Sequence, residues 1–127
     1  MKKIAQTICA TFIGFSLMAC EANTSAHIDS QAIQAQLTNK EALLIDVRTQ
    51  SEYNAGHVAA SVLAPYDSIA QTIGTLAPNK NQKVYLYCRS GSRASAALNT
   101  LKGMGYTDVT NLGGLNDLTQ YGLSIGQ

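Results

Sequence analysis

The sequence predicts a small three-layer α/β domain, in which a parallel sheet is flanked by helices. The chain has 127 residues, of which 46% are hydrophobic and 13% are charged, and this composition fits a single packed domain. Two continuous apolar runs, at 42–47 and 83–87, have the composition of strands buried on both faces. Such runs alternate with segments of helical periodicity, which is typical of a parallel sheet covered by helices.

Residues 1–20 are predicted to be an export signal and not part of the domain. A pair of lysines precedes an apolar run at 8–19 that is too short for a stable membrane span. The run ends in "LMAC", which resembles the lipobox of bacterial lipoproteins, where the cysteine, here Cys20, is acylated. We therefore expect a lipoprotein on the periplasmic side of a bacterial membrane. The alternative is cleavage after Ala26, which would release a soluble periplasmic protein.

The domain itself is expected to span residues 27–127, after a small, polar tether at 21–26, and to hold one thiol. Cys9 leaves with the signal, and Cys20 is either acylated or removed, so only Cys88 remains and no internal disulfide can form. In an oxidising compartment, a single retained cysteine is either buried and inert or kept for its reactivity.

The first two elements of the domain are predicted from a helix start and a buried run. A helix is expected at 29–39, with Ile28 packing on Ile33 across its beginning. The run 42–47 then predicts a strand that is interrupted by Asp46 near its carboxyl end.

Capping boxes predict the next two helices. Thr49 and Glu52 form a T-x-x-E box for a short helix, and Ser68 with Gln71 forms a second box for a longer one. Between them, the run 61–65 predicts a short strand that is closed by a proline.

The second half of the domain repeats the alternation of strand and helix. The strand predicted at 83–87 is rich in β-branched and aromatic residues and runs directly into Cys88. An apolar stripe predicts a helix at 94–104, and a last buried strand is expected at 108–112. A pair of glycines then turns the chain into a terminal helix that begins at Leu115.

The segment that follows the strand at 83–87 is the strongest candidate for a functional site. In open α/β sheets, ligands bind beyond the carboxyl ends of the strands, where helices present unpaired backbone N–H groups. These amides and the helix dipole would form an anion-binding nest over Cys88 and favour its thiolate. An inert core cysteine does not account for the glycine, the two hydroxyls and the two arginines that follow it: Arg89, Ser90, Gly91, Ser92 and Arg93.

Three stretches of the mature sequence resemble the rhodanese family. "LLIDVRTQSEYNAGHVAASVLAP" is similar to the family's D-V-R…E-x-x-x-G-H segment, and "YCRSGSRA" is similar to its six-residue active loop C-R-x-G-x-R. "NLGGLNDL" resembles the closing G-G segment. The chain departs from the family at Leu118, where an aromatic residue is common, and at Ala60, where glycine is usual. The resemblance covers nearly all of the mature domain and implies a single-domain, rhodanese-like sulfurtransferase.

The resemblance implies that Cys88 carries sulfur as a persulfide. The donor would be a small anion such as thiosulfate, and the acceptor would be a thiol or cyanide, with no cofactor and no metal ion. The loop amides would hold the persulfide, while Arg93, and more peripherally Arg89, would orient the anionic donor. The alternative is a sulfur-carrier or binding module that serves a dedicated protein partner in an exported relay.

The length of the loop argues against a cysteine phosphatase. The phosphatase loop has the pattern C-x-x-x-x-x-R, which would require an arginine at Ala94. Arg93 closes a loop that is one residue shorter. We interpret this shorter loop as suited to bind sulfur rather than a phosphoryl group.

Other polar residues are interpreted as structural support. Asp46 and Arg48 are expected to form an ion pair beside the site, His57 to be a satisfied structural group, and Glu52 to act as a helix cap. The net charge of +1 provides no basic field for nucleic acid, so we expect partners that are small or specific. We also expect the protein to be a monomer.

Overall fold

A computed structural model describes residues 29–126 of the chain. The expectations for the signal at 1–20, for acylation of Cys20, for the tether at 21–26 and for Ile28 lie outside these residues. Within 29–126, no helix combines the length and the apolar character that a membrane span requires.

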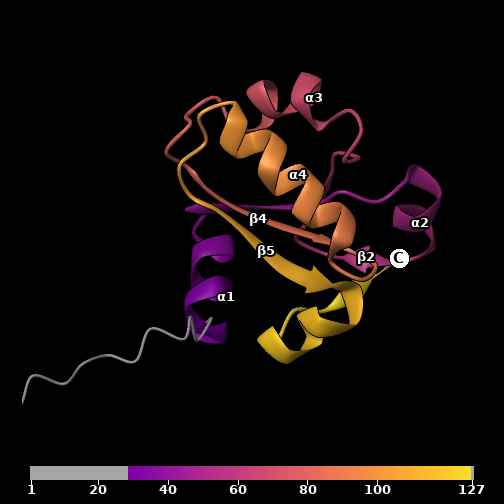
Figure 1. Cartoon of the computed structure of the whole chain (residues 1–127). Helices are drawn as coiled ribbons and strands as arrows, with labels where there is room; N and C mark the ends of the chain where they lie inside the picture. Colours follow the sequence, from indigo (N-terminus) through magenta and orange to yellow (C-terminus); the bar gives the residue numbers. More distant parts are fainter. Residues whose placement is uncertain (1–28, 127) are drawn as a thin grey trace, which may run out of the picture.

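The described residues form a parallel sheet with helices on both faces (Figure 1). The sheet has the strand order β3-β1-β4-β5, and all three pairings are parallel. Its strands are β1 (Ala42–Asp46), β3 (Val62–Leu63), β4 (Lys83–Cys88) and β5 (Val109–Gly114). The helices are α1 (Ser30–Thr38), α2 (Gln50–Ala55), α3 (Ile69–Leu76), α4 (Ser92–Gly103) and the 3₁₀ helix η1 (Leu115–Tyr121). The prediction of a three-layer α/β domain is therefore confirmed.

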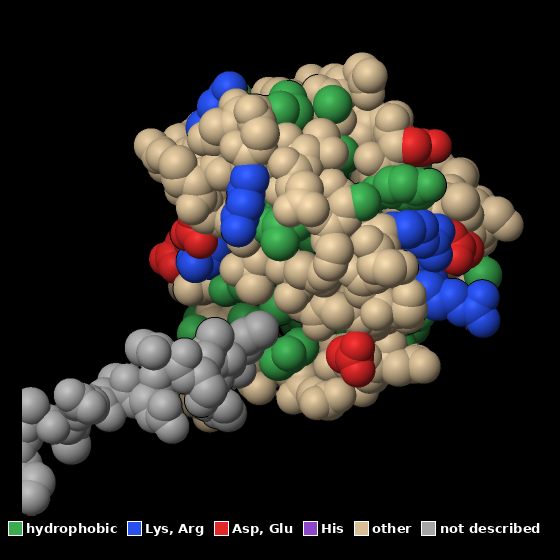
Figure 2. Space-filling view, viewed as in Figure 1, with side chains coloured by type: hydrophobic (Ala, Val, Ile, Leu, Met, Phe, Trp, Pro, Cys, Tyr) green, Lys and Arg blue, Asp and Glu red, His purple; other side chains and the backbone are tan. Residues whose placement is uncertain are grey.

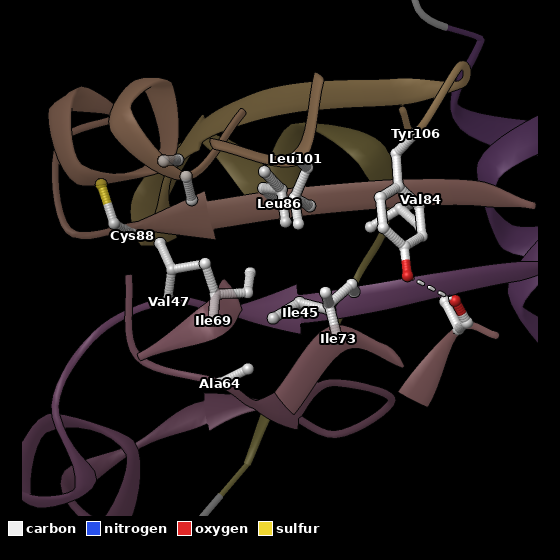
Figure 3. Packing of buried hydrophobic residues seen from close by; sticks show 13 residues of the cluster. Ile45, Val47, Ala64, Ile69, Ile73, Val84, Leu86, Cys88, Leu101 and Tyr106 are labelled. Carbon is white, nitrogen blue, oxygen red and sulfur yellow. Dashed lines mark hydrogen bonds between the residues drawn. The ribbon is translucent and has the colours of Figure 1, made fainter. Parts of the chain in front are cut away.

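Two hydrophobic clusters fill the two sides of the sheet. Successive side chains of a strand point to opposite faces, so Val84, Leu86 and Cys88 of β4 lie on one side and Tyr85 and Tyr87 lie on the other. The first side packs against α3 and α4, as Figure 3 shows for the cluster around Leu86. The second side packs against α1 and η1. The alternation places the cysteine on the side of the sheet where α4 begins.

A second, two-stranded sheet was not predicted from the sequence. β2 (His57–Val58) pairs antiparallel with β6 (Ile125–Gly126), and this pairing brings the end of the described chain beside α2. Strands this short carry no recognisable alternation, so only the tertiary structure reveals them.

The capping box predicted from Ser68 and Gln71 is wrong. Ser68 begins α3, but its side chain makes no cap hydrogen bond, and its backbone angles of φ −122° and ψ 2° are not the extended ones that a cap adopts. Its hydroxyl donates instead to the carbonyl oxygen of Pro65 at 3.4 Å. The Gln71 N–H donates to the backbone carbonyl of Ser68 rather than to its side chain.

The boundaries of several elements also differ from those predicted. β1 ends at Asp46 rather than at residue 47, and β4 extends by one residue to include Cys88. α4 begins at Ser92, before its apolar stripe starts, because the first turn of a helix need not contribute to the core. The terminal helix is a 3₁₀ helix, and β5 is shifted to later residues and is only partly buried.

Candidate active site

Cys88 ends β4 and lies completely buried, at 0% exposure. Its side chain points from the end of the strand into the loop that follows, as Figure 3 shows. There the N–H of Gly91 donates a hydrogen bond to Sγ at 2.9 Å. Gly91 has φ 98°, a left-handed conformation that favours glycine and that lets the loop fold back over the sulfur. A substrate can therefore reach Sγ only if the loop or the cysteine side chain moves.

Asn111 of β5 holds this loop, and no sequence motif had identified it as a site residue. Its amide nitrogen Nδ2 donates to the Gly91 carbonyl oxygen at 2.9 Å and to Ser95 Oγ at 3.0 Å. Its Oδ1 accepts from the N–H of Gly113 at 2.8 Å. The one sequence signal for this role was that Asn111 is a polar residue near the carboxyl end of a predicted strand. That signal points to the loop only when β5 is known to pair with β4.

The glycine pair at the end of β5 packs directly against the loop. Gly113 has φ 100°, and the Gly114 N–H donates to Asp117 Oδ2 at 2.8 Å. A Cβ atom added at Gly114 would collide with the carbonyl oxygen of Arg89. The first peptide of the loop can therefore occupy its place only because this position has no side chain.

Arg93 is bound to Glu52 through both of its terminal nitrogens. Nη1 donates to Oε2 at 2.7 Å and Nη2 donates to Oε1 at 2.8 Å, a bidentate pair that joins α4 to α2. Oε2 also accepts from the backbone N–H and the hydroxyl of Thr49, which completes the predicted capping box. The sequence predicted only the capping role of Glu52. Its contact with Arg93 was not predicted.

The ion pair between Glu52 and Arg93 shifts the pKa of both residues. Hydrogen bonding to Arg93, followed by the Thr49 N–H, holds the pKa of Glu52 well below its usual range. The same contact raises the pKa of Arg93. Arg93 was expected to attract and orient the anionic donor. It already has a carboxylate partner, because α2 lies against the start of α4.

The ion pair expected between Asp46 and Arg48 is present, and it is buried. Arg48 Nη2 lies 2.7 Å from Asp46 Oδ2, and Nε is 3.0 Å from each carboxylate oxygen. Arg48 Nη2 also donates to the Gly56 carbonyl oxygen at 2.7 Å. The hydrogen bond to Asp46 raises the pKa of Arg48. Together these contacts fix the carboxyl end of β1 to the end of α2.

His57 makes structural contacts, in line with its interpretation as a satisfied group. Its Nδ1 lies 2.8 Å from the Tyr53 carbonyl oxygen, and its ring stacks on the Tyr53 ring with centroids 3.6 Å apart. Nearby, Tyr87 accepts from the Val58 N–H at 3.1 Å and shares a 2.9 Å hydrogen bond with Ser61. Burial raises the pKa of Tyr87 to about 12. These groups hold β2 in place.

The remaining predicted site residues lie at the surface around the loop. Ser90 and Ser92 are exposed, with their hydroxyl oxygens 3.4 Å apart. Arg89 is exposed and faces a pocket of about 350 Å³. The edge of the molecule where β4 and β5 end carries basic side chains beside an acidic one (Figure 2). The residues that line the pocket are Arg48, Glu52, Ala55, Gly56, Arg89, Leu115, Asn116 and Ile125.

The described residues, 29–126, hold no cluster of three or more His, Cys, Asp or Glu side chains that could bind a metal ion.

Comparison with known proteins identifies the family. The model of the rhodanese-like domain matches residues 29–120. The chain belongs to the rhodanese family. This match includes β1, the loop at Cys88 and the glycine pair, which are the segments that carried the resemblance in the sequence.

Individual relatives agree with this assignment. The thiosulfate sulfurtransferase PspE of Escherichia coli is 39% identical over 74 residues, which cover 58% of this chain and 71% of PspE. The putative sulfur carrier protein YrkF of Bacillus subtilis is 30% identical over 100 residues, and this chain spans about half of its length (53%). A solved structure described as rhodanese with anions from E. coli has a TM-score of 0.64 at 34% identity, covering 68% of this chain and 98% of that one.

Replacing Glu52 by Gln should destabilise the protein in a pH-dependent way. At pH 7 the variant loses the charged pair with Arg93, and we expect the free energy of unfolding to fall by about 1 kcal/mol. Because folding lowers the pKa of Glu52, its contribution is complete above about pH 4.5, the ordinary value, and is lost as the pH falls below it. Urea unfolding at pH 7 and pH 3 should therefore show a difference that shrinks at the lower pH.

Glu41→Gln is the matched control for this change. Glu41 is exposed, and among residues 29–126 its carboxylate has no ion-pair partner. This variant should stay within about 0.5 kcal/mol of the wild type at pH 7. An equal loss in both variants would mean that the pair between Glu52 and Arg93 contributes nothing specific.

Replacing Gly114 by Ala should disturb the loop. The added methyl group displaces the Arg89 peptide, so we expect a loss of about 1–3 kcal/mol in the free energy of unfolding and faster hydrogen exchange at the Gly91 amide. Gly103→Ala is the control, because a Cβ there meets no atom within 4 Å and lies in a helix. Wild-type stability and exchange in the Gly114 variant would contradict the tight contact.

Proposed function

We propose that this protein is a sulfurtransferase that transfers sulfane sulfur through a persulfide on Cys88. The observation that carries the proposal is the hydrogen bond from the Gly91 N–H to Cys88 Sγ at the carboxyl end of β4. An N–H donor at 2.9 Å favours negative charge on the sulfur, whether that sulfur belongs to a thiolate or to the persulfide that replaces it. The similarity to the thiosulfate sulfurtransferase PspE supports the same reaction class.

The proposed reaction has two displacements. The Cys88 thiolate attacks the outer sulfur of thiosulfate, the sulfur–sulfur bond of the donor breaks, and its electron pair leaves with sulfite. The cysteine then carries the transferred sulfur as a persulfide anion. In the second step, cyanide or a thiolate attacks the outer sulfur of the persulfide, and Cys88 is released as a thiolate. No external oxidant or reductant is required, because sulfur is transferred as a neutral atom: in each step the nucleophile supplies the electron pair of the new bond, and the leaving group keeps the pair of the bond that breaks.

The burial of Cys88 gives a specific reason to keep the sulfur-carrier alternative. A sulfur at 0% exposure under its loop is poorly placed for rapid exchange with any small molecule in solution, and the loop must first move. A dedicated protein partner could supply the binding energy for that movement. The name of the relative YrkF, a putative sulfur carrier, is in line with this alternative.

Incubation with thiosulfate should add one sulfur atom to Cys88, and cyanide should remove it as thiocyanate. Intact mass spectrometry before and after each step measures both events, and Cys88→Ser should show neither. A persulfide that forms but does not pass to cyanide or to small thiols would favour the carrier. Hydrolysis of aryl phosphates without any persulfide would contradict the sulfurtransferase proposal.

We also propose that the protein is exported and anchored through Cys20, on the basis of the "LMAC" stretch. Acylation at this residue gives several acyl chains, which is enough for stable membrane attachment. In a bacterial host, the wild-type chain should incorporate labelled palmitate and fractionate with membranes, and Cys20→Ala should do neither. A mature protein that carries no fatty acid and begins at His27 would show instead that the signal is cleaved after Ala26.

A further inference from the structure

Gly91 links the sulfur of Cys88 to the start of α4 through both of its backbone polar groups. Its N–H donates to Cys88 Sγ at 2.9 Å. Its carbonyl oxygen accepts from the Ser95 N–H at 3.0 Å and from Asn111 Nδ2 at 2.9 Å. Glycine adopts positive and negative φ with similar ease, so nothing in the residue itself fixes its φ of 98°. The direction of this N–H toward the sulfur therefore depends on the groups that hold the Gly91 carbonyl.

Asn111 is the group that ties this carbonyl to the sheet. Ser95 belongs to α4, which continues the loop itself, whereas Asn111 belongs to β5, which pairs with β4 (Figure 1). The Asn111 side chain uses Nδ2 toward the Gly91 carbonyl oxygen and Ser95 Oγ, and it uses Oδ1 toward the Gly113 N–H. Exchanging the nitrogen and the oxygen would place an acceptor against the Gly91 carbonyl and a donor against the Gly113 N–H. One orientation of the amide therefore satisfies all of its contacts.

The pairing of β5 with β4 is irregular at this place. Leu86 is paired with Asn111, and two residues further along β4, Cys88 is paired with Gly114. β5 therefore advances by three residues, from 111 to 114, while β4 advances by two, from 86 to 88. Such irregularities redirect side chains and are frequent beside active sites. The extra residue follows Asn111, whose side chain lies against α4, and it leads the chain into the glycine pair.

We propose that Asn111 is a positioning residue for the sulfur chemistry of Cys88, and that it acts by holding the Gly91 N–H on the sulfur. This inference rests on the proposed function and adds a residue that acts only through the loop. The Cys88 thiolate attacks the outer sulfur of thiosulfate, the sulfur–sulfur bond breaks, and its electron pair leaves with sulfite. A donor that is already in place stabilises the charged sulfur without any rearrangement during this step. Without Asn111, the Gly91 carbonyl keeps only its contact within α4, and the N–H is no longer fixed relative to β4.

The first test measures the first displacement alone, on the full-length chain. Protein is mixed with excess thiosulfate and quenched at intervals, and intact mass spectrometry gives the rate of persulfide formation at each thiosulfate concentration. Asn111→Leu replaces the amide by an apolar side chain of similar size. It should lower the maximum rate by about tenfold or more, because the donor to the sulfur is misplaced. The thiosulfate concentration that gives half of the maximum rate should change by less than roughly threefold, because Asn111 acts on the sulfur and not on the anion.

The second test observes the Gly91 N–H itself. In the wild type, its hydrogen bond to Sγ should shift the amide proton resonance downfield, and Asn111→Leu should move this resonance toward the value of an unbonded amide. A purely structural role of Asn111 would lower the melting temperature but would leave this resonance in place in the folded protein. Asn111→Ser should give the same changes in rate and resonance, because its hydroxyl ends one bond short of the Asn111 amide. This smaller, neutral variant keeps the test valid if Asn111→Leu does not fold.

Asn99→Leu is the matched control. It makes the same substitution at an exposed position in the second half of α4, away from the loop. This variant should keep the wild-type rate of persulfide formation and the wild-type Gly91 resonance. Thermal unfolding of each variant shows whether a lost rate reflects a lost fold.

The outcomes separate this inference from the proposed function. If the wild type forms no Cys88 persulfide, the proposed function itself is wrong. If the persulfide forms and both Asn111 variants match the wild type in rate and in the Gly91 resonance, the function stands and the positioning role is wrong. A slower rate with an unchanged resonance also contradicts the inference, because the loss then does not act through this N–H. A faster rate in the variants would overturn it as well, since Asn111 would then only restrain the loop against opening.

Discussion

The hydrogen bond from the Gly91 N–H to Cys88 Sγ is the contact around which the other features of the site are arranged. It exists because the chain reverses within a few residues after β4, and three neighbouring groups hold that reversal. Asn111 binds the Gly91 carbonyl, the glycine pair of β5 leaves room for the Arg89 peptide, and α4 begins directly after the turn. As a result, the Gly91 N–H contacts Cys88 Sγ, although Cys88 otherwise belongs to the hydrophobic core.

The two ion pairs around the loop hold helices and strands in place. They also determine which arginine near the loop is left without a carboxylate partner. The pair between Asp46 and Arg48 is almost completely buried, so losing either partner would leave an isolated charge in the interior. The pair between Glu52 and Arg93 is partly exposed and acts between α2 and α4. Because each of these pairs neutralises one arginine, Arg89 is the one arginine among residues 29–126 that has no carboxylate partner.

Local sequence signals were reliable where the interaction they described was itself local. The Thr49 and Glu52 box forms as predicted, and buried apolar runs became β1 and β4 within one residue of their predicted ends. The box at Ser68 failed although its residues fit the same pattern, because the backbone entering α3 is not extended there. β2 and β6 are too short to show a period, and their pairing joins segments far apart in the chain.

The sequence by itself determined the fold class, the family and the identity of the loop, because alternating apolar runs and the C-R-S-G-S-R segment are patterns of neighbouring residues. Only the tertiary structure decided which arginine is free and which residues surround it. Glu52 and Arg93 are 41 positions apart, and Asn111 is 20 positions from Gly91, so no local pattern relates them. The pocket is likewise assembled from α2, the loop, η1 and β6, which meet only after the sheet has formed.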